Sequence, residues 1–166
     1  MRPWHAEVLE DHEALKEQLN AFQDTLCGDQ KGLERYAALC RILRVIGPDL
    51  ALHLKKEEEV VFPALDRLAA GPQRRALAAL RKQHDQLREI LHRLAGLLCQ
   101  CEGIKKLKWA QIAKAGRAFI DLLTEHEQRE DRLLAEVLES GLKPAELMQL
   151  GQQLNQVAWK AREEGL

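Results

Sequence analysis

The sequence predicts an all-α protein, an up-down-up-down four-helix bundle with a short C-terminal fifth helix. Apolar residues recur at steps of three and four along four long segments, which is the period of one helix face. Aromatic residues make up only 4% of the chain, while 46% is apolar and 31% is charged, a composition that favours helix over strand. Connections containing Gly or Pro separate the segments, so consecutive helices are expected to pack as antiparallel neighbours.

Each segment ends at residues that interrupt a helix. The expected helices cover residues 4–27, 33 to about 69, about 72 to 101, about 109 to 139, and 144 to about 162. Gly47-Pro48 lies within the second, where we expect a kink or a junction of two helices because proline removes a backbone donor. We therefore expect a bundle over residues 1–140 and, over residues 141–166, an amphipathic helix packed on that bundle.

Charge and hydropathy exclude several kinds of partner. The formal net charge is −1, which gives no electrostatic case for nucleic acid or an anionic membrane. No apolar run approaches the length of a membrane span, and the N-terminus lacks the apolar core of a signal peptide. We expect a cytoplasmic protein that binds neither nucleic acid nor membrane. The oligomeric state stays open, with a homodimer as one alternative.

The four cysteines, Cys27, Cys40, Cys99 and Cys101, do not match a zinc motif. A structural zinc site of that kind needs a pair of C-x-x-C knuckles, and the chain has none. We expect four reduced thiols that are partly buried.

Two histidine–glutamate pairs carry the main functional signal. His53 precedes Glu57 by four residues, and His126 precedes Glu130 by four residues. Four residues is just over one helical turn, so the two side chains of each pair point the same way. An imidazole nitrogen beside a carboxylate supplies two ligands for a first-row transition metal.

A further histidine lies upstream of each pair, on the apolar stripe of its own helix. His12 and His53 are 41 residues apart, and His84 and His126 are 42 apart, which indicates two matching helical hairpins. The residues expected to converge in the core are His12, His53, Glu57, His84, His126 and Glu130. Without partners their burial would cost several kcal/mol of desolvation. They suit two metal ions bridged by two carboxylates.

Other polar residues have simpler interpretations. A lone histidine such as His84 is more often a hydrogen-bonded core residue than a ligand, so the metal hypothesis depends on all six residues together. We expect His92 behind the ligands or at the surface, and His5 at a frayed end. Catalytic residues are unknown, because only Glu58 and Glu59 could act in acid–base chemistry and both are expected in solvent.

These motifs resemble the hemerythrin-like, or HHE cation-binding, domain family. The matching stretches are DHEALKEQL around His12, HLKKEEEVVFPAL from His53, KQHDQLREIL around His84, and EHEQREDRLL around His126. The resemblance implies a four-helix bundle around a non-haem di-iron centre with an oxo or hydroxo bridge. It further implies that one iron is bound by His12 and His53 and the other by His84 and His126. Glu57 and Glu130 would bridge the two irons.

One position departs from the oxygen-carrying members of that family. They use a further histidine one turn after the third-helix ligand, where this chain has Arg88, which is no ligand at neutral pH. The remaining set of four histidines and two glutamates is similar to that of di-iron proteins that repair iron–sulfur clusters after nitrosative or oxidative damage.

The resemblance favours a di-iron protein that binds a small ligand such as O2 or NO, in sensing, storage or the response to nitrosative or oxidative stress. The alternatives are a redox enzyme that reduces NO or peroxide, and an iron donor for cluster repair. Zn or Mn could also occupy an imidazole-rich site. In a regulatory alternative, the C-terminal helix is a surface for a partner.

Overall fold

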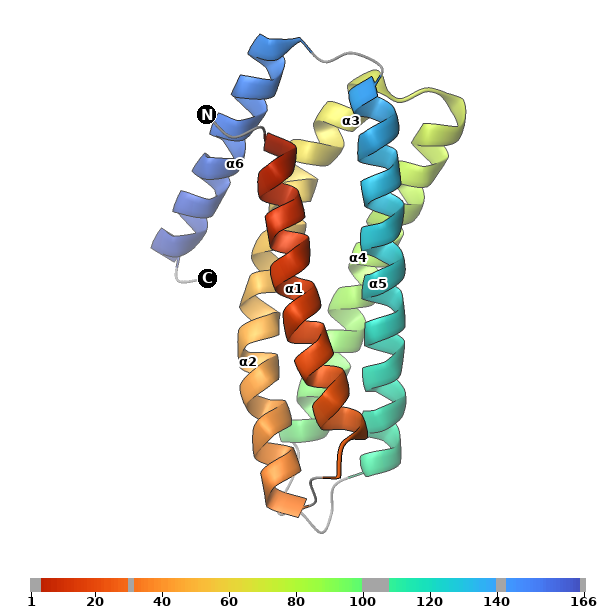
Figure 1. The fold of residues 1–166 in the computed structure, drawn as a ribbon, viewed down its shortest axis with the longest axis vertical. Helices are drawn as coiled ribbons and strands as arrows, with labels where there is room; N and C mark the ends of the chain where they lie inside the picture. Colours follow the sequence, from red (N-terminus) through yellow and green to blue (C-terminus); the bar gives the residue numbers. More distant parts are fainter. Residues whose placement is uncertain (1–3, 30–31, 100–107, 140–142, 165–166) are drawn as a thin grey trace.

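The long helices α1, α2, α4 and α5 lie side by side along one axis, and α6 lies against one side of them (Figure 1). The computed structural model describes residues 4–29, 32–99, 108–139 and 143–164, without the side chains of 4–7 and 137–139. In chain order the elements are α1 (Trp4–Cys27), α2 (Gly32–Lys56), the π-helical segment η1 (Glu57–Val61), α3 (Phe62–Leu68), α4 (Gly71–Cys99), α5 (Trp109–Glu139) and α6 (Pro144–Glu164). These described ranges contain no strand, so the predicted all-α class is confirmed.

Of the two alternatives expected at Gly47-Pro48, a kink or a junction of two helices, the structure excludes the junction. Pro48 lies inside α2, which continues without a junction to Lys56. The hydrogen-bond pattern changes instead in η1, where the backbone N–H of Phe62 donates to the carbonyl of Glu57. Pro63 follows directly, and in a regular α-turn its ring would clash with the carbonyl four residues back. The wider π-turn gives that ring room, and such turns are frequent at functional sites.

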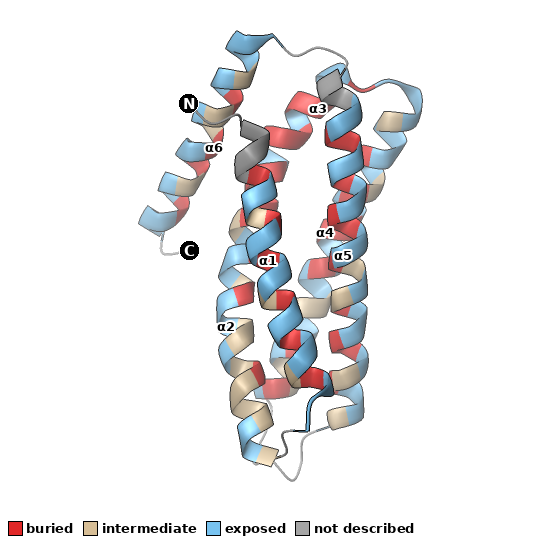
Figure 2. Ribbon diagram, in the orientation of Figure 1, coloured by how far each residue is buried: buried red, intermediate tan, exposed pale blue. Residues whose placement is uncertain are grey.

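The buried core consists of two apolar clusters with a polar layer between them. On α1, Val8 belongs to one cluster and Leu15 to the other, with His12 between them. On α4, Leu80 and Leu87 flank a buried histidine in the same way. In Figure 2 the buried positions lie on the sides of the helices that face one another. The predicted ligands therefore occupy one level of the bundle.

The C-terminal helix α6 packs on the chain itself. Its buried residues Leu150, Leu154 and Val157 join the cluster that contains Val8 and Val60. At the C-terminal end of α6, the side chains of Lys55 and Glu164 form an ion pair near the surface. Within the described ranges, every helix is too short or too polar to cross a membrane.

Candidate metal centre

Six buried polar side chains meet in the layer between the two apolar clusters. They are the six that the sequence singled out: His12, His53, Glu57, His84, His126 and Glu130. The most exposed, His12, retains only 5% of its accessible surface, and four of the six retain none. The convergence that the helical stripes predicted is therefore present. That these residues bind metal stays a prediction from their geometry and chemistry.

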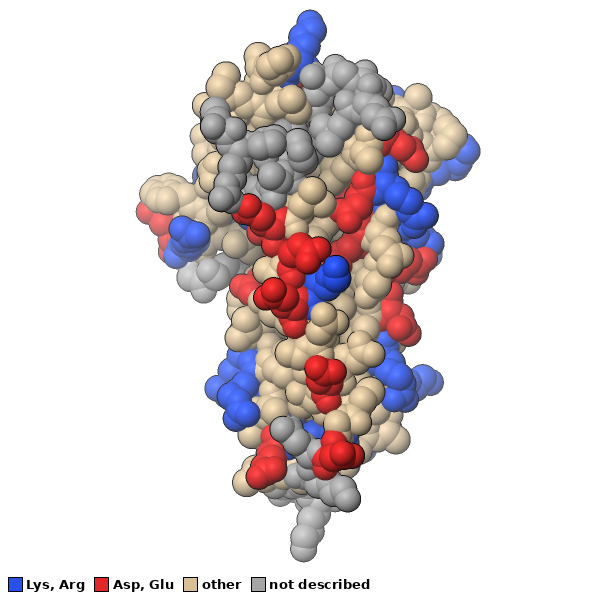
Figure 3. Space-filling view, viewed as in Figure 1, with Lys and Arg blue, Asp and Glu red and all other residues tan. Residues whose placement is uncertain are grey.

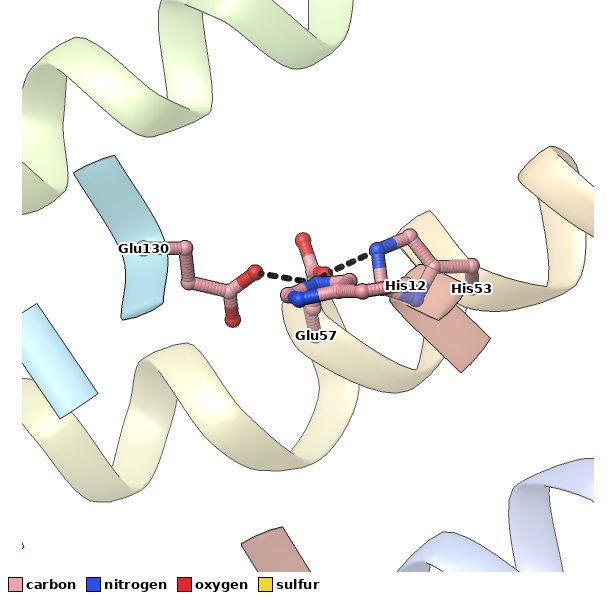
Figure 4. A group of neighbouring side chains, drawn as sticks. All are labelled: His12, His53, Glu57 and Glu130. Atoms are coloured by element: carbon pink, nitrogen blue, oxygen red, sulfur yellow. Dashed lines mark hydrogen bonds and ion pairs between the residues drawn. The ribbon is translucent and has the colours of Figure 1, made fainter. Parts of the chain in front are cut away.

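The six residues form two groups that share Glu57. One group is His12, His53, Glu57 and Glu130, and the other is Glu57, His84 and His126. In each group, one nitrogen or oxygen from every residue lies within 4.8 Å of the others. Figure 4 shows the first group, with its four side chains pointing toward a common centre.

Glu57 directs one carboxylate oxygen toward each pair of histidines. Its Oε1 is 2.5 Å from Nε2 of His53 and 3.8 Å from Nε2 of His12. Its Oε2 is 2.8 Å from Nε2 of His84 and 3.4 Å from Nε2 of His126. A carboxylate in this position can bridge two cations, one on each side.

Glu130 lies nearer to the first pair of histidines. Its Oε2 is 3.1 Å from Nε2 of His12, while its Oε1 has no hydrogen-bond partner. The bridging role that the family resemblance implies for Glu130 is therefore not visible in these contacts, and it stays a prediction.

Buried polar atoms without a hydrogen bond indicate whether the residues at the centre fit a cation. The buried side-chain atoms without a hydrogen bond include His126 Nε2 and Glu130 Oε1. His53 Nε2, His84 Nε2 and both oxygens of Glu57 also lack one, although they lie at ion-pair distance from one another. A buried polar group left unpaired costs about 1–3 kcal/mol. Neutral imidazole nitrogens and ionised carboxylates offer lone pairs, and a cation satisfies several of them at once. The donor set therefore fits a metal.

Charge and burial set the protonation states of this cluster. Burial would raise the pKa of Glu57, but the charge of His53 and the nearby imidazole of His12 hold that pKa well below its ordinary value. Burial lowers the pKa of His126. Both groups are therefore in the state that binds metal at neutral pH, a carboxylate and a neutral imidazole.

The other members of the first group must lose protons to bind a cation. Burial and the negative charge of Glu57 raise the pKa of Glu130 to about 8. Burial alone would lower the pKa of His12, but hydrogen bonds to Asp131 and Glu130 outweigh it and raise the pKa to about 12. Metal binding here therefore releases protons and strengthens as pH rises.

A carboxylate lies behind three of the four histidines, on the nitrogen that faces away from the centre. The three contacts are His12 Nδ1 to Asp131 Oδ1 (3.0 Å), His84 Nδ1 to Glu58 Oε1 (2.8 Å) and His53 Nδ1 to Asp11 Oδ2 (3.8 Å). Such partners fix the orientation and tautomer of a metal-binding imidazole and raise its basicity.

We did not predict these outer carboxylates from the sequence. Glu58 is exposed, as expected, but its side chain also contacts His84 and Arg88, at 2.8 Å each. Arg88, at the position of a further histidine in the oxygen carriers, thus lies outside the centre. One feature of the sequence could have indicated them: every outer carboxylate is next in sequence to a predicted ligand.

His92 and the three described cysteines belong to neither donor group. His92 is exposed on α4, one of the two locations we expected. Cys27 and Cys99 are exposed free thiols and Cys40 is partly buried. The side chain of His5 and all of Cys101 lie outside the described residues.

The surface near the centre is acidic on one face. In Figure 3, Asp and Glu side chains gather along the middle of the view, over α1. Negative potential raises the local concentration of cations, so this face favours their approach to the buried donors.

A helical bundle with buried histidines and glutamates at one level is typical of metal-binding helical proteins. The Hemerythrin HHE cation binding domain model matches residues 5–138, and a second match covers residues 75–162. The chain belongs to the hemerythrin HHE cation-binding family, which confirms the resemblance found in the motifs. Comparisons with curated proteins and with solved structures gave no match.

Proposed function

We propose that the chain binds two iron ions at this centre and presents them to a small ligand such as O2 or NO, in the response to nitrosative or oxidative stress. The observation that carries the proposal is Glu57, which has one oxygen toward each histidine pair. Nitrogen and oxygen donors of this kind suit iron, although Zn and Mn accept them too. When bound, iron supplies affinity for diatomic gases and one-electron redox chemistry.

The proposal also includes the order of the four long helices and a second bridging carboxylate. An up-down-up-down order of α1, α2, α4 and α5 is supported by the packing of chain neighbours on one another. With Glu130 as second bridge, each metal receives two imidazoles and two carboxylate oxygens. This is fewer than the six donors of an octahedral ion, so the donor count leaves room for an exogenous ligand.

A pocket beside His53 supports a small ligand. It has a volume of about 230 Å³ and lies between α1 and α2. Its lining consists of Asp11, Ala14, Leu15, Asp49, Leu52 and His53. Three of these residues are apolar, and the two aspartates disfavour an anionic substrate, so the pocket suits a small uncharged ligand such as O2 or NO.

Filling this pocket is expected to slow access of the gas. In the Ala14→Trp protein the indole occupies the pocket, and the reaction of the reduced iron protein with NO should slow by about tenfold or more. Iron content should not change, because Ala14 is exposed and donates nothing to the centre. Stopped-flow absorption measures the rate. Ala21→Trp, at an exposed position two turns further along α1, is the control; equal rates in both variants would show that NO enters elsewhere.

The proposed function is tested by iron content and spectroscopy together. Protein purified with iron should hold about two ions per chain, and its near-ultraviolet and visible absorption should change when NO is added to the reduced form. Fewer than about two ions per chain, or a spectrum that does not respond to NO or O2, would contradict the proposal.

A redox enzyme that reduces NO or peroxide is the second candidate, with iron donation to damaged clusters as a related role. The observation that favours it is Glu127, a carboxyl group with 8% of its surface exposed and an Oε1 atom without a partner. It follows His126 directly, and these reductions consume protons that such a group can carry. Steady turnover with an added reductant would support the enzyme, whereas one reaction per centre would support binding.

A further inference from the structure

The internal repeat extends beyond the ligands to the residues behind them. The residue after each glutamate ligand contacts the first histidine of the other hairpin. Glu58 accepts from Nδ1 of His84 at 2.8 Å, and Asp131 accepts from Nδ1 of His12 at 3.0 Å. The two halves therefore match at these outer positions in both chemistry and geometry.

A second outer position matches in its place in the sequence but differs in chemistry. Asp11, directly before the first ligand, lies 3.8 Å from Nδ1 of His53 in the same hairpin. The corresponding residue of the other hairpin is Gln83, directly before its first ligand, and the corresponding ring is that of His126. Oε1 of Gln83 and Nδ1 of His126 are both buried, and neither has a hydrogen-bond partner.

We propose that Gln83 is the outer partner of His126 in the metal-bound protein and that this neutral amide makes the two metal positions unequal in affinity. The inference rests on the proposed two-metal centre. Nδ1–H of His126 would donate to Oε1 of Gln83, which pairs two buried groups that otherwise stay unsatisfied. An amide oxygen polarises an imidazole less than a carboxylate does, so His126 is a weaker donor than His53.

Neighbouring charges increase this difference. Behind the first pair of histidines lie the carboxylates of Asp11 and Asp131, and Lys56 contacts Asp11 at 2.7 Å. This set of three groups carries one net negative charge.

Behind the second pair lie one carboxylate and one amide. Arg88 contacts the carboxylate of Glu58 at 2.8 Å and lies 3.8 Å from the exposed carboxylate of Asp85. Glu58, Arg88 and Gln83 together carry no net charge, and water screens the charge of Asp85. Once His12 and Glu130 have released their protons, a cation is therefore held more tightly by His12 and His53 than by His84 and His126, and the ion at the second position exchanges first.

Titration of the metal-free full-length protein with Fe²⁺ under anaerobic conditions, against a competing chelator, tests the inference. We expect two binding steps whose dissociation constants differ by about 10–100-fold, the usual effect of an outer partner on metal affinity. Gln83→Glu should strengthen the weaker step and bring the two together. Gln86→Glu, an identical charge change at an exposed position of α4, should leave both steps near their original values.

Asp11→Asn tests the same idea without adding a buried charge. It should weaken the tighter step by about tenfold or more and leave the weaker step in place. The inference would be overturned if two ions bind with equal affinities, or if Gln83→Glu and Gln86→Glu have equal effects. Either result would leave the proposal of a two-metal centre intact. Binding of fewer than about two ions would overturn both.

Discussion

Glu57→Gln protein is expected to hold less than about one metal ion per chain, against about two in the unaltered protein. Glutamine has nearly the same shape, so the fully buried site gains no cavity. The substitution removes the negative charge and turns one of the two oxygens that face the histidines into an amide nitrogen, which is no metal ligand. Because Glu57 belongs to both groups of donors, the loss affects both positions.

Metal analysis after gel filtration measures this effect, with circular dichroism to establish that the variant is folded. Glu59→Gln is the matched control, because the side chain lies two residues further along η1 and is exposed. A Glu57→Gln protein that retains a full metal content would show that this carboxylate does not bridge. A variant that loses only one ion would assign Glu57 to one position alone.

His126→Ala protein is expected to lose at least one metal ion and to unfold more easily by about 2 kcal/mol or more. The ring is fully buried, so its removal leaves a cavity, and the stabilisation from the bound ion is lost as well. Urea denaturation together with metal analysis measures both effects. His53→Ala should behave in the same way.

His92→Ala provides the comparison, because this ring is exposed on α4. It should change neither metal content nor the free energy of unfolding by more than about 0.5 kcal/mol. Equal metal content in His92→Ala and His126→Ala would mean that the wrong helix faces have been assigned to the centre.

The sequence predicted the parts of the fold that depend on one helix at a time. Steps of three and four between apolar residues mark the buried face of a helix, and every predicted ligand on such a stripe is buried. The change in helical pattern was misplaced, because the rule that proline interrupts a helix applies equally to Pro48 and Pro63. Only the packing around each proline shows that α2 accommodates the first and that a π-turn precedes the second.

The outer partners could not be predicted because each contact joins distant segments. Glu58 and His84 are 26 residues apart, and Asp131 and His12 are 119 apart. Periodicity tells which face of a helix is apolar, but not which polar residue at the edge of that face meets a neighbouring helix. Glu58 is an example, since an exposed glutamate next to a ligand has no property in the sequence that separates it from Glu59.

The π-turn of η1 changes the rotational phase of the chain between the donor layer and the apolar layer next to it. Three consecutive residues, Val60, Val61 and Phe62, are all buried there, although a regular helix turns by about 100° from one residue to the next and would expose one of them. Removal of a single residue from this turn would rotate one half of the segment relative to the other. Either Glu57 would swing out of the centre, or Phe62 would swing toward water.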